Sequence, residues 1–151
     1  MNSIKIKKFH ELAKLPSRQT HGSAGYDLYA CIPEGKKEII LTAQNVILIP
    51  TGIGIDLPIG WEAQIRPRSG LSTKNKIILI NSPGTVDSDY RGEIFVPMMN
   101  LSDKDFTITN EMRIAQMVVA RYEIFKWELV QELSDSDSDR GCGGFGSSGT
   151  H

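Results

Sequence analysis

Short apolar runs rich in β-branched residues recur along the chain, with turn residues between them. Seven runs have the length of a strand: residues 39–41, 46–49, 62–66, 77–80, 93–98, 106–109 and 114–121. Turn residues occur at 33–35, 58–60, 82–84 and 100–103. Runs of this length, bounded by Gly, Pro, Asn and Asp, are typical of antiparallel β-structure.

The start of the chain and one internal segment complete this pattern. Ile4, Lys5, Ile6 and Lys7 alternate with a period of two, which predicts an opening edge strand. Helical signal is confined to residues 71–76, enough for a helical turn or two. Because the sequence contains no long amphipathic helix, we expect an all-β fold, an antiparallel sandwich or barrel.

The C-terminal end has a different composition. Residues 134–139 read Ser-Asp-Ser-Asp-Ser-Asp and contain no apolar side chain. Such a segment cannot offset the entropy lost on ordering by burying surface. We therefore expect a β-core domain over residues 1–133 and a flexible C-terminal arm over residues 134–151.

Composition and charge limit the partners. The 151 residues, 40% hydrophobic and 23% charged, are enough for one domain with a substantial core. The net charge of −1 provides no broad basic field for a duplex, so we expect no nucleic-acid partner. No apolar stretch is long enough to cross a bilayer, so we expect no membrane partner.

Cysteine usage and the N-terminus bear on the compartment. Cys31 and Cys142 cannot form a disulfide framework, and no metal-ligand spacing is present. Free thiols are compatible with a reducing compartment. Because no continuous apolar region follows the lysines near the N-terminus, we expect no secretory signal. We expect a cytoplasmic protein, with a nuclear or organellar location of a processed form as the alternative.

The arm carries the first candidate site. Residues 140–149 contain five glycines, which allow backbone N–H groups to approach an anion closely. Arg140 adds a guanidinium suited to a phosphate, Ser147 and Ser148 add hydroxyls, and Phe145 offers a ring that could stack on a base. The alternative is a disordered Gly/Ser tail or a cloning remnant.

A second candidate follows a predicted strand. Arg68, Ser69 and Gly70 would present a guanidinium, a hydroxyl and free backbone N–H groups near the start of the helical turn. This combination suits an anion. For an isolated Arg-Ser-Gly the alternative, a turn with a solvated arginine, is the better interpretation.

The third candidate is the polar connection over residues 81–92, which we expect to be a long hairpin arm too polar for the core. In an extended segment Asp87 and Asp89 would point the same way, with Ser88 and Tyr90 on the other side. One carboxylate could orient a water for attack on phosphorus. The alternative is a loop in which an Asp caps the turn.

Two further residues interrupt apolar segments. Asp27, within residues 24–30, is either a buried hydrogen-bond acceptor or a distant partner of a bound cation. Gln116, within residues 114–119, either pairs with neighbouring backbone or faces a ligand. The sequence gives no preference for Gln116.

In their order along the chain, these motifs resemble those of a known family. Residues 24–30, 67–72, 84–94, 113–119 and 140–149 are similar to the five motifs of the trimeric dUTPase family. The similarity covers almost the whole chain. Pro-Arg-Ser-Gly-Leu, Val-Asp-Ser-Asp-Tyr-Arg-Gly and the glycine-rich motif would rarely occur together by chance.

The resemblance implies a fold, a reaction and an assembly. The fold would be a jelly-roll-like β-sandwich, and the assembly a homotrimer whose active sites are shared between subunits. The reaction would be hydrolysis of dUTP to dUMP and pyrophosphate by Mg²⁺-assisted attack of water at the α-phosphorus. Such an enzyme limits uracil incorporation into DNA and supplies dUMP for dTMP synthesis.

The resemblance also implies roles for the hairpin. Asp87 would position the attacking water. The uracil edge would be read by Asn81 and by the hairpin backbone at Gly84, Thr85 and Val86. Tyr90 would pack beneath the deoxyribose and exclude a 2′-hydroxyl.

Phosphate and metal roles follow in the same way. Arg68, Ser69, Gly70 and Gln116 would contact the α- and β-phosphates, and Asp27 would hold waters of the Mg²⁺ shell. In the arm, the residues implied to contact substrate are Arg140, Phe145, Gly146, Ser147 and Ser148, with Phe145 over the uracil. Cys142 departs from the family pattern, in which a small or polar residue is usual, and we treat it as incidental to catalysis.

Two other functions are compatible with the scaffold. A dCTP deaminase would need an acid/base group at the 4-amino carbon, and such enzymes lack this hairpin and the Phe-containing tail. A non-enzymatic binding module would be expected to lack Asp87 first. Pyrophosphate release against ammonia release separates the first alternative from dUTP hydrolysis.

Overall fold

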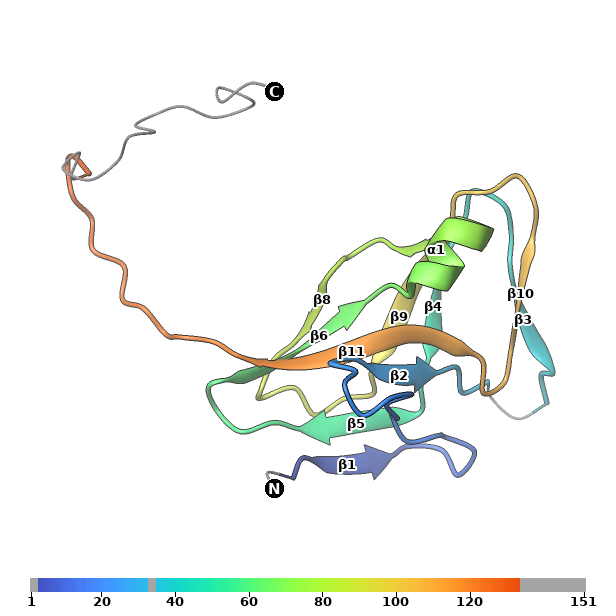
Figure 1. The fold of residues 1–151 in the computed structure, drawn as a ribbon, viewed down its shortest axis with the longest axis horizontal. Coiled ribbons are helices and arrows are strands. Elements are labelled where there is room, and N and C mark those ends of the chain that lie inside the picture. Colours follow the sequence, from blue (N-terminus) through green and yellow to red (C-terminus); the bar gives the residue numbers. More distant parts are fainter. Residues whose placement is uncertain (1–2, 33–34, 134–151) are drawn as a thin grey trace.

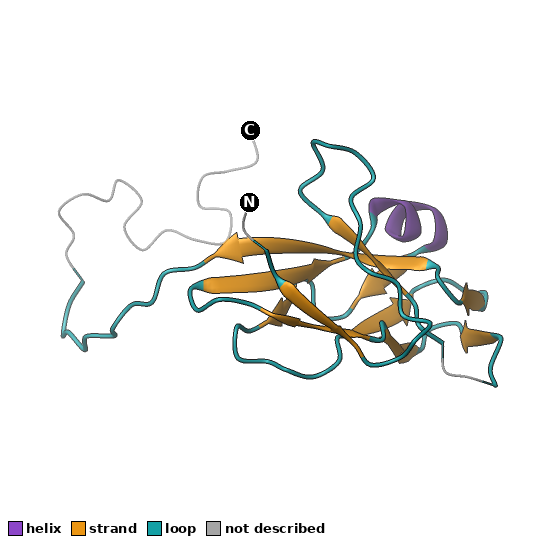
Figure 2. Cartoon of the chain, turned by 90° about the horizontal axis from the view of Figure 1, so that it is seen from below, coloured by secondary structure: helices purple, strands orange, loops and turns teal. Residues whose placement is uncertain are grey.

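Strands make up nearly all of the regular structure, as Figure 2 shows. The computed structural model describes residues 3–32 and 35–133. Within these ranges the only helix is α1 (Ser69–Asn75). The strands are β1 (Lys5–Lys8), β2 (Tyr26–Tyr29), β3 (Glu38–Leu41), β4 (Val46–Pro50), β5 (Ile53–Asp56), β6 (Trp61–Arg66), β7 (Ile77–Leu79), β8 (Gly84–Val86), β9 (Phe95–Asn100), β10 (Phe106–Thr109) and β11 (Arg113–Arg121).

The strands pair into two larger and two smaller antiparallel sheets. The larger ones have the orders β2-β11-β6-β8 and β4-β9-β7, and the smaller ones pair β1 with β5 and β10 with β3. In Figure 1, β11 runs beside β2 across the molecule, and β1 and β5 lie together at one edge. Many neighbours are distant in sequence, as in a jelly roll. The expected all-β, jelly-roll-like fold is confirmed.

The core lies between the two larger sheets. Leu28 and Ala63 face inward from the first sheet, and Ile49, Val96 and Met98 face inward from the second; all are almost completely buried. Removing this apolar area from water is the main favourable term in folding. Burial alternates with a period of two along β9, although its sequence is apolar at nearly every position.

Helix α1 is short and has a defined end. Arg68 precedes it in an extended conformation, and Leu71 is its buried residue. Lys76 closes it in the left-handed region at φ 57°, with its backbone N–H donated to the carbonyls of Leu71 and Ser72. The helix begins two residues earlier than residues 71–76 predict, because the backbone at Ser69 is already helical.

All seven predicted runs and the opening edge strand coincide with strands, within a few residues at their ends. Three strands were not predicted: β2, β5 and β8. β2 carries the polar Asp27, and β5 is short and contains Gly54. For β8 the prediction of a connection too polar for the core is wrong, because Gly84 and Val86 are buried when β8 pairs with β6.

The chain leaves the sheets after β11. Residues 122–133 form no strand or helix and lead away from the strands in Figure 1. Their apolar side chains are exposed, among them Phe125 at 76%, Trp127 at 98% and Leu129 at 100%. The predicted arm over residues 134–151 lies outside the described residues. No helix among the residues described here is long and apolar enough to span a membrane.

Candidate active site

The outer face of the four-stranded sheet carries a row of polar side chains. Gln116 lies opposite Asp27 on one side and opposite Arg66 on the other. Directly opposed residues point to the same face of a sheet, so these three side chains share the outward face. Their neighbours in sequence, such as Leu28 and Met117, turn inward to the core.

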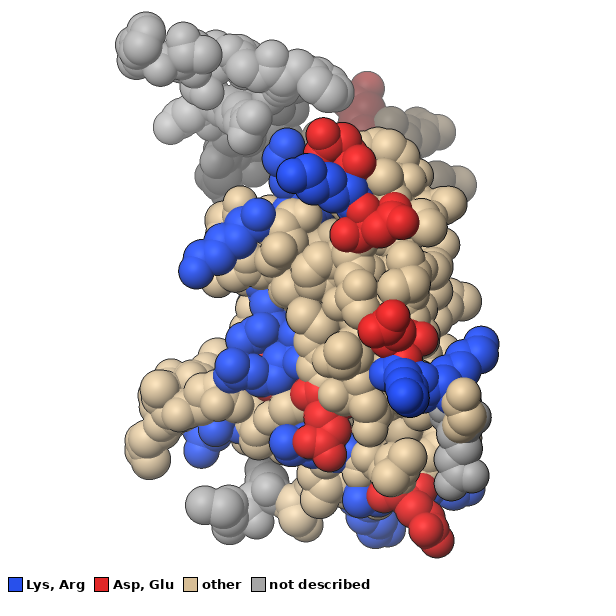
Figure 3. Space-filling view, turned by 90° about the vertical axis from the view of Figure 1, so that its right-hand side faces the viewer, with Lys and Arg blue, Asp and Glu red and all other residues tan. Residues whose placement is uncertain are grey.

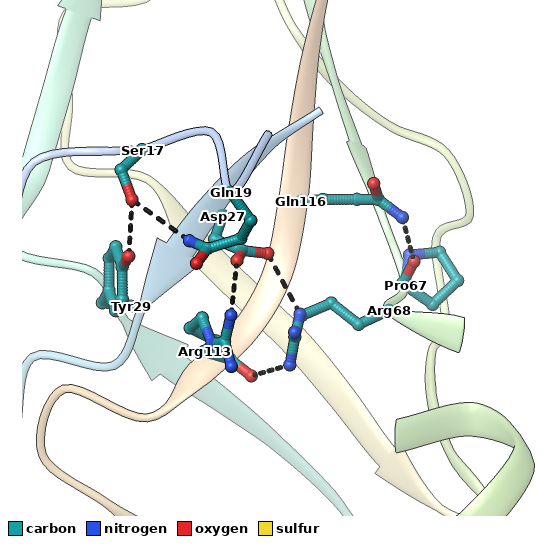
Figure 4. Close-up of polar contacts among 8 residues, drawn as sticks. All are labelled: Ser17, Gln19, Asp27, Tyr29, Pro67, Arg68, Arg113 and Gln116. Carbon is teal, nitrogen blue, oxygen red and sulfur yellow. Dashed lines mark hydrogen bonds and ion pairs between the residues drawn. The ribbon is translucent and has the colours of Figure 1, made fainter. Parts of the chain in front are cut away.

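Asp27 is the centre of a charged network (Figure 4). Arg68 donates its Nε–H to Oδ1 at 3.0 Å, and Arg113 donates an Nη1–H to Oδ2 at 3.3 Å. Arg68 also donates to the backbone carbonyl of Arg113 at 3.2 Å. The Asp27 side chain is only 11% exposed. A carboxylate this buried requires paired charge, so the two arginines stabilise it while it fixes the direction of the Arg68 guanidinium.

Gln116 is held by neighbouring backbone. Its Nε2–H donates to the carbonyl of Pro67 at 2.9 Å. The absence of a side chain at Gly25 makes room for its amide, since a Cβ at that position would overlap Gln116 Oε1. The structure therefore shows backbone pairing through Nε2, which also orients the turn that leads to Arg68, while the same side chain borders a cavity.

These groups line one cavity. Asp27, Arg68, Ser69, Gly70 and Gln116 face the same hollow, of about 370 Å³. The segments that carry them are far apart in sequence and meet because β2, β11 and β6 are neighbours. The predicted phosphate-binding residues of the core are therefore brought together. A guanidinium, a hydroxyl and an amide around one hollow suit a polyanion.

Charge elsewhere is mixed. On the face in Figure 3, Lys and Arg side chains occur beside Asp and Glu. This agrees with the net charge of −1 and with local rather than broad recognition of an anion.

The predicted base-binding hairpin is built around β8. Gly84 pairs with Ile65 and Thr85 pairs with Gln64. The Asn81 side chain folds over Gly84, where a Cβ would come within 3.0 Å of Asn81 Nδ2. The hairpin connects β7 to β9, which pair with each other in the other large sheet.

After β8 the chain turns instead of continuing as a strand. The backbone N–H of Tyr90 donates to the carbonyl of Asp87 at 3.1 Å, closing a turn over residues 87–90. Asp87 and Asp89 would point the same way only if the backbone were extended, and in this turn it is not. Asp87 is exposed at the start of this turn. The Tyr90 hydroxyl donates to the carbonyl of Glu93 at 2.7 Å, which fixes the ring over Gly92.

Asp87 and the Arg68 cluster lie toward opposite ends of β6. Val86 pairs with Ala63, so Asp87 follows at the Glu62 end of the strand, whereas Arg68 lies beyond Arg66. Glu62 and Arg66 alone are about 13 Å apart along an extended strand. The register of one chain therefore does not bring Asp87 to the Arg68 cluster.

Arg113 has no role that its sequence context alone predicts. Its only signal in the sequence was its position at the start of the strand that carries Gln116, and its pairing with Asp27 depends on the neighbouring β2. The arm residues Arg140, Phe145, Gly146, Ser147 and Ser148 lie outside the described residues.

Comparison with known proteins identifies the group to which this arrangement belongs. The model of the dUTPase family matches residues 11–149. The chain belongs to the dUTPase family. The resemblance seen in the sequence motifs is thereby confirmed, and the deaminase and binding-module alternatives are not supported.

Individual proteins similar to this chain are also named as dUTPases. A deoxyuridine 5'-triphosphate nucleotidohydrolase of Orientia tsutsugamushi (strain Boryong) is 52% identical over 149 residues, 97% of each chain. One from Leptospira interrogans (serovar copenhageni, strain Fiocruz L1-130) is 47% identical, over 97% of this chain and 98% of its own. The solved structure of the Staphylococcus bacteriophage 80alpha dUTPase with dUPNHPP has a TM-score of 0.88, 25% identity and 99% coverage of both chains.

Proposed function

We propose that this chain is a dUTP diphosphatase that hydrolyses dUTP to dUMP and pyrophosphate. Family membership and relatives of nearly equal length that carry this activity in their names support the reaction. The observation that carries the proposal is the cavity lined by Asp27, Arg68 and Gln116, whose polar groups suit a triphosphate. A water attacks the α-phosphorus, the bond to the bridging α,β-oxygen breaks, and the β- and γ-phosphates leave as pyrophosphate.

Asp87 positions the attacking water. An exposed carboxylate at the start of a closed turn can accept a hydrogen bond from a water and direct its lone pair at phosphorus. Asn81 and the backbone at Gly84, Thr85 and Val86 read the uracil. The Tyr90 ring, held over Gly92, packs against the deoxyribose where a 2′-hydroxyl would clash.

Arg68, Ser69, Gly70 and Gln116 contact the α- and β-phosphates. The Arg68 guanidinium is preorganised for this by Asp27, so little reorganisation accompanies binding.

Asp27 also fits an indirect role toward Mg²⁺. Each of its oxygens accepts one hydrogen bond from an arginine, and a carboxylate can accept about four in all. The remaining capacity, on the cavity side, can hold waters of a hydrated ion. No group of three or more His, Cys, Asp or Glu residues suited to holding a metal occurs in the part of the chain that the structure describes. The ion in this proposal is carried by the triphosphate. When bound, Mg²⁺ neutralises charge on the phosphates.

The arm supplies the rest of the site. Arg140, Ser147 and Ser148 close on the γ-phosphate, and Phe145 with Gly146 covers the uracil. The support is the chemistry of residues 140–149 and their place in the match to the dUTPase family.

The active enzyme is a homotrimer with shared active sites. The separation of Asp87 from Arg68 supports this, because a site that uses both must draw them from different copies. A second support is the apolar sheet face, the outward face of β4-β9-β7. It is formed by Val46, Leu48, Pro50, Ile78, Ile80, Phe95, Pro97 and Met99.

This face has the character of an interface. Leu48 is 61% exposed and Ile80 54% in the single chain. Soluble monomers rarely expose apolar patches of this continuity.

In the cell the enzyme works in the cytoplasm, where it limits uracil incorporation into DNA and supplies dUMP for dTMP synthesis.

Turnover of dUTP, UTP, dTTP and dCTP, with and without Mg²⁺, tests the reaction. We expect pyrophosphate from dUTP only, no ammonia from dCTP, and a strong requirement for Mg²⁺. Equal turnover of UTP would contradict the role given to Tyr90, and ammonia release would indicate the deaminase reaction instead.

Asp87→Asn tests the mechanism. The amide keeps the shape and loses the charge that orients the water, so we expect kcat to fall about 10³-fold. Affinity for the non-hydrolysed analogue dUPNHPP, measured by calorimetry, should stay within about threefold, because Asp87 is not a phosphate ligand. Asp89→Asn is the matched control, on the same turn and without an assigned role. Wild-type turnover by Asp87→Asn would disprove the mechanism.

A further inference from the structure

The loop that follows Asp87 is tied to the end of β5. Arg91 places its Nη2 at 2.8 Å from Oδ1 of Asp56, the last residue of β5. The contact crosses a long stretch of sequence and joins the exposed turn to a strand of the core. Gly54, also on β5, lies so close to the carbonyl of Gly92 that a Cβ there would come within 2.6 Å of it.

The same guanidinium also holds the turn itself. Its Nη1 donates to the carbonyl of Ser88 at 2.6 Å and to the carbonyl of Tyr90 at 3.1 Å. Ser88 immediately follows Asp87, and Tyr90 closes the turn on the Asp87 carbonyl. One side chain therefore connects the backbone beside Asp87 to a fixed point on β5.

The ion pair is too exposed to be important for global stability. The Arg91 side chain is 57% exposed and that of Asp56 41%. Exposed pairs of this kind contribute little to folding. The geometry can still matter for catalysis, since a displacement of about 1 Å can cost about a hundredfold in rate.

We infer that Arg91 and Asp56 are a positioning pair, which holds the turn so that Asp87 points at the attacking water. Neither side chain contacts the substrate. The inference rests on the proposed role of Asp87 and adds the device that fixes its direction. Tyr90 is held on the same turn by its own hydrogen bond to Glu93, so substrate binding depends less on the pair than the chemical step does.

Steady-state kinetics of Arg91→Ala in the full chain test the pair. We expect kcat to fall between about tenfold and a hundredfold, while KM changes less than about threefold. Arg91→Lys should recover part of kcat, because an ammonium still pairs with Asp56 but cannot bridge both carbonyls. The double variant Arg91→Ala/Asp56→Ala should be no slower than Arg91→Ala alone, since both changes break one link.

Lys5→Ala is the matched control. Lys5 lies 3.8 Å from the other oxygen of Asp56 and is 88% exposed, but it does not touch the turn. Its removal should leave kcat unchanged. If Arg91→Ala does not fold, Asp56→Asn replaces it, because this change weakens the link and leaves the two carbonyl contacts of Arg91 in place.

Three results would overturn the inference: unchanged kcat in the Arg91 variant or its replacement, a rise in KM with kcat intact, or losses that multiply in the double variant. A rise in KM alone would make Arg91 a substrate ligand. Asp87→Asn separates this failure from failure of the proposed function. If Asp87→Asn is inactive while Arg91→Ala is fully active, only the positioning pair is wrong.

Discussion

The two larger sheets resemble each other on their inner faces and differ on their outer faces. Inside, both contribute tightly buried aliphatic side chains to one core. Outside, the β2-β11-β6-β8 sheet presents the row of Asp27, Gln116 and Arg66, whereas the β4-β9-β7 sheet presents the apolar sheet face. The same antiparallel pairing therefore presents a polar, charged surface on one sheet and an apolar surface on the other, and we propose ligand binding at the first and association at the second.

The two outer faces can differ because packing of the core constrains only the inward positions of each strand. The core requires only that alternate residues be apolar, so the outward positions of a strand are free to serve another purpose. On the first sheet the outward positions include the largely buried charge of Asp27, which must be paired, and Arg68 and Arg113 pair with it. On the second, the outward side chains remain apolar, which a single copy of the chain leaves exposed to water.

The largest expected effect comes from placing a charge on the apolar sheet face. In Leu48→Glu the carboxylate would be buried without a partner on association, at a cost of several kcal/mol. We expect dissociation of the proposed trimer and a loss of turnover of at least about 10³-fold, as for Asp87→Asn, because Asp87 and Arg68 then no longer meet. Light scattering and a turnover assay on the same sample measure both.

Ile59→Glu is the control for that change. Ile59 is 85% exposed on the turn between β5 and β6, away from the apolar sheet face. It should leave both mass and activity unchanged. A Leu48→Glu protein that stays trimeric would remove the distinction between the two outer faces.

An intermediate effect is expected on the polar face. Asp27→Asn removes the charge that orients Arg68 and leaves two arginines close together. We expect about a tenfold loss of kcat/KM and a destabilisation of about 1–3 kcal/mol, the cost of a broken, largely buried pair. Glu111→Gln, which breaks the exposed pair with Lys14, should change neither quantity. Full activity in Asp27→Asn would show that Arg68 does not need this support.

The smallest effect is expected where the two sheets are joined. The backbone N–H of Cys31, which follows β2, donates to the carbonyl of Pro50 at the end of β4, and the residue is 2% exposed. Burial raises the pKa of the Cys31 thiol, the charge of Glu93 adds to the rise, and Lys8 opposes it. Above about pH 8.5 the unfolded thiol loses its proton while the folded one keeps it.

The free energy of unfolding should therefore fall as the pH rises through this range, by at most about 1.4 kcal/mol per unit from this group. Below about pH 8.5 the contribution is fully present. Cys31→Ala should show a shallower decline between pH 8 and 10 in urea titrations. Identical slopes in the two proteins would show that the thiol titrates alike in both states.

Much of the fold was predictable because its strands are short apolar runs rich in β-branched residues, separated by turn residues. The runs that became β4, β9 and β11 are visible in the sequence for this reason. β8 was not visible, because three residues between polar segments show no period; only pairing with β6 makes Gly84 and Val86 part of the core. β2 was not predicted because the charged Asp27 interrupts its apolar run. The ion pairs of Asp27 with two arginines allow this charge to be buried in the strand.

The candidate site likewise has residues that the sequence identifies and residues that only the structure reveals. The motifs around Arg68, Asp87 and Gln116 are local runs of functional groups, and the sequence alone identified them and the family that they resemble. Arg113 and Asp56 could not be found from the sequence, because each acts through a partner on another strand.

The sequence by itself determined the all-β class, the family and the residue types available for chemistry, since these follow from short apolar runs bounded by turn residues and from short contiguous motifs. Tertiary structure alone decided which outer face is polar and which exposes apolar side chains to solvent. It also decided that Asp27, Arg68 and Gln116 share a cavity while Asp87 lies toward the other end of β6. The physical reason is that strand register and sheet order place side chains that are distant in sequence, and neither can be read from a run of residues.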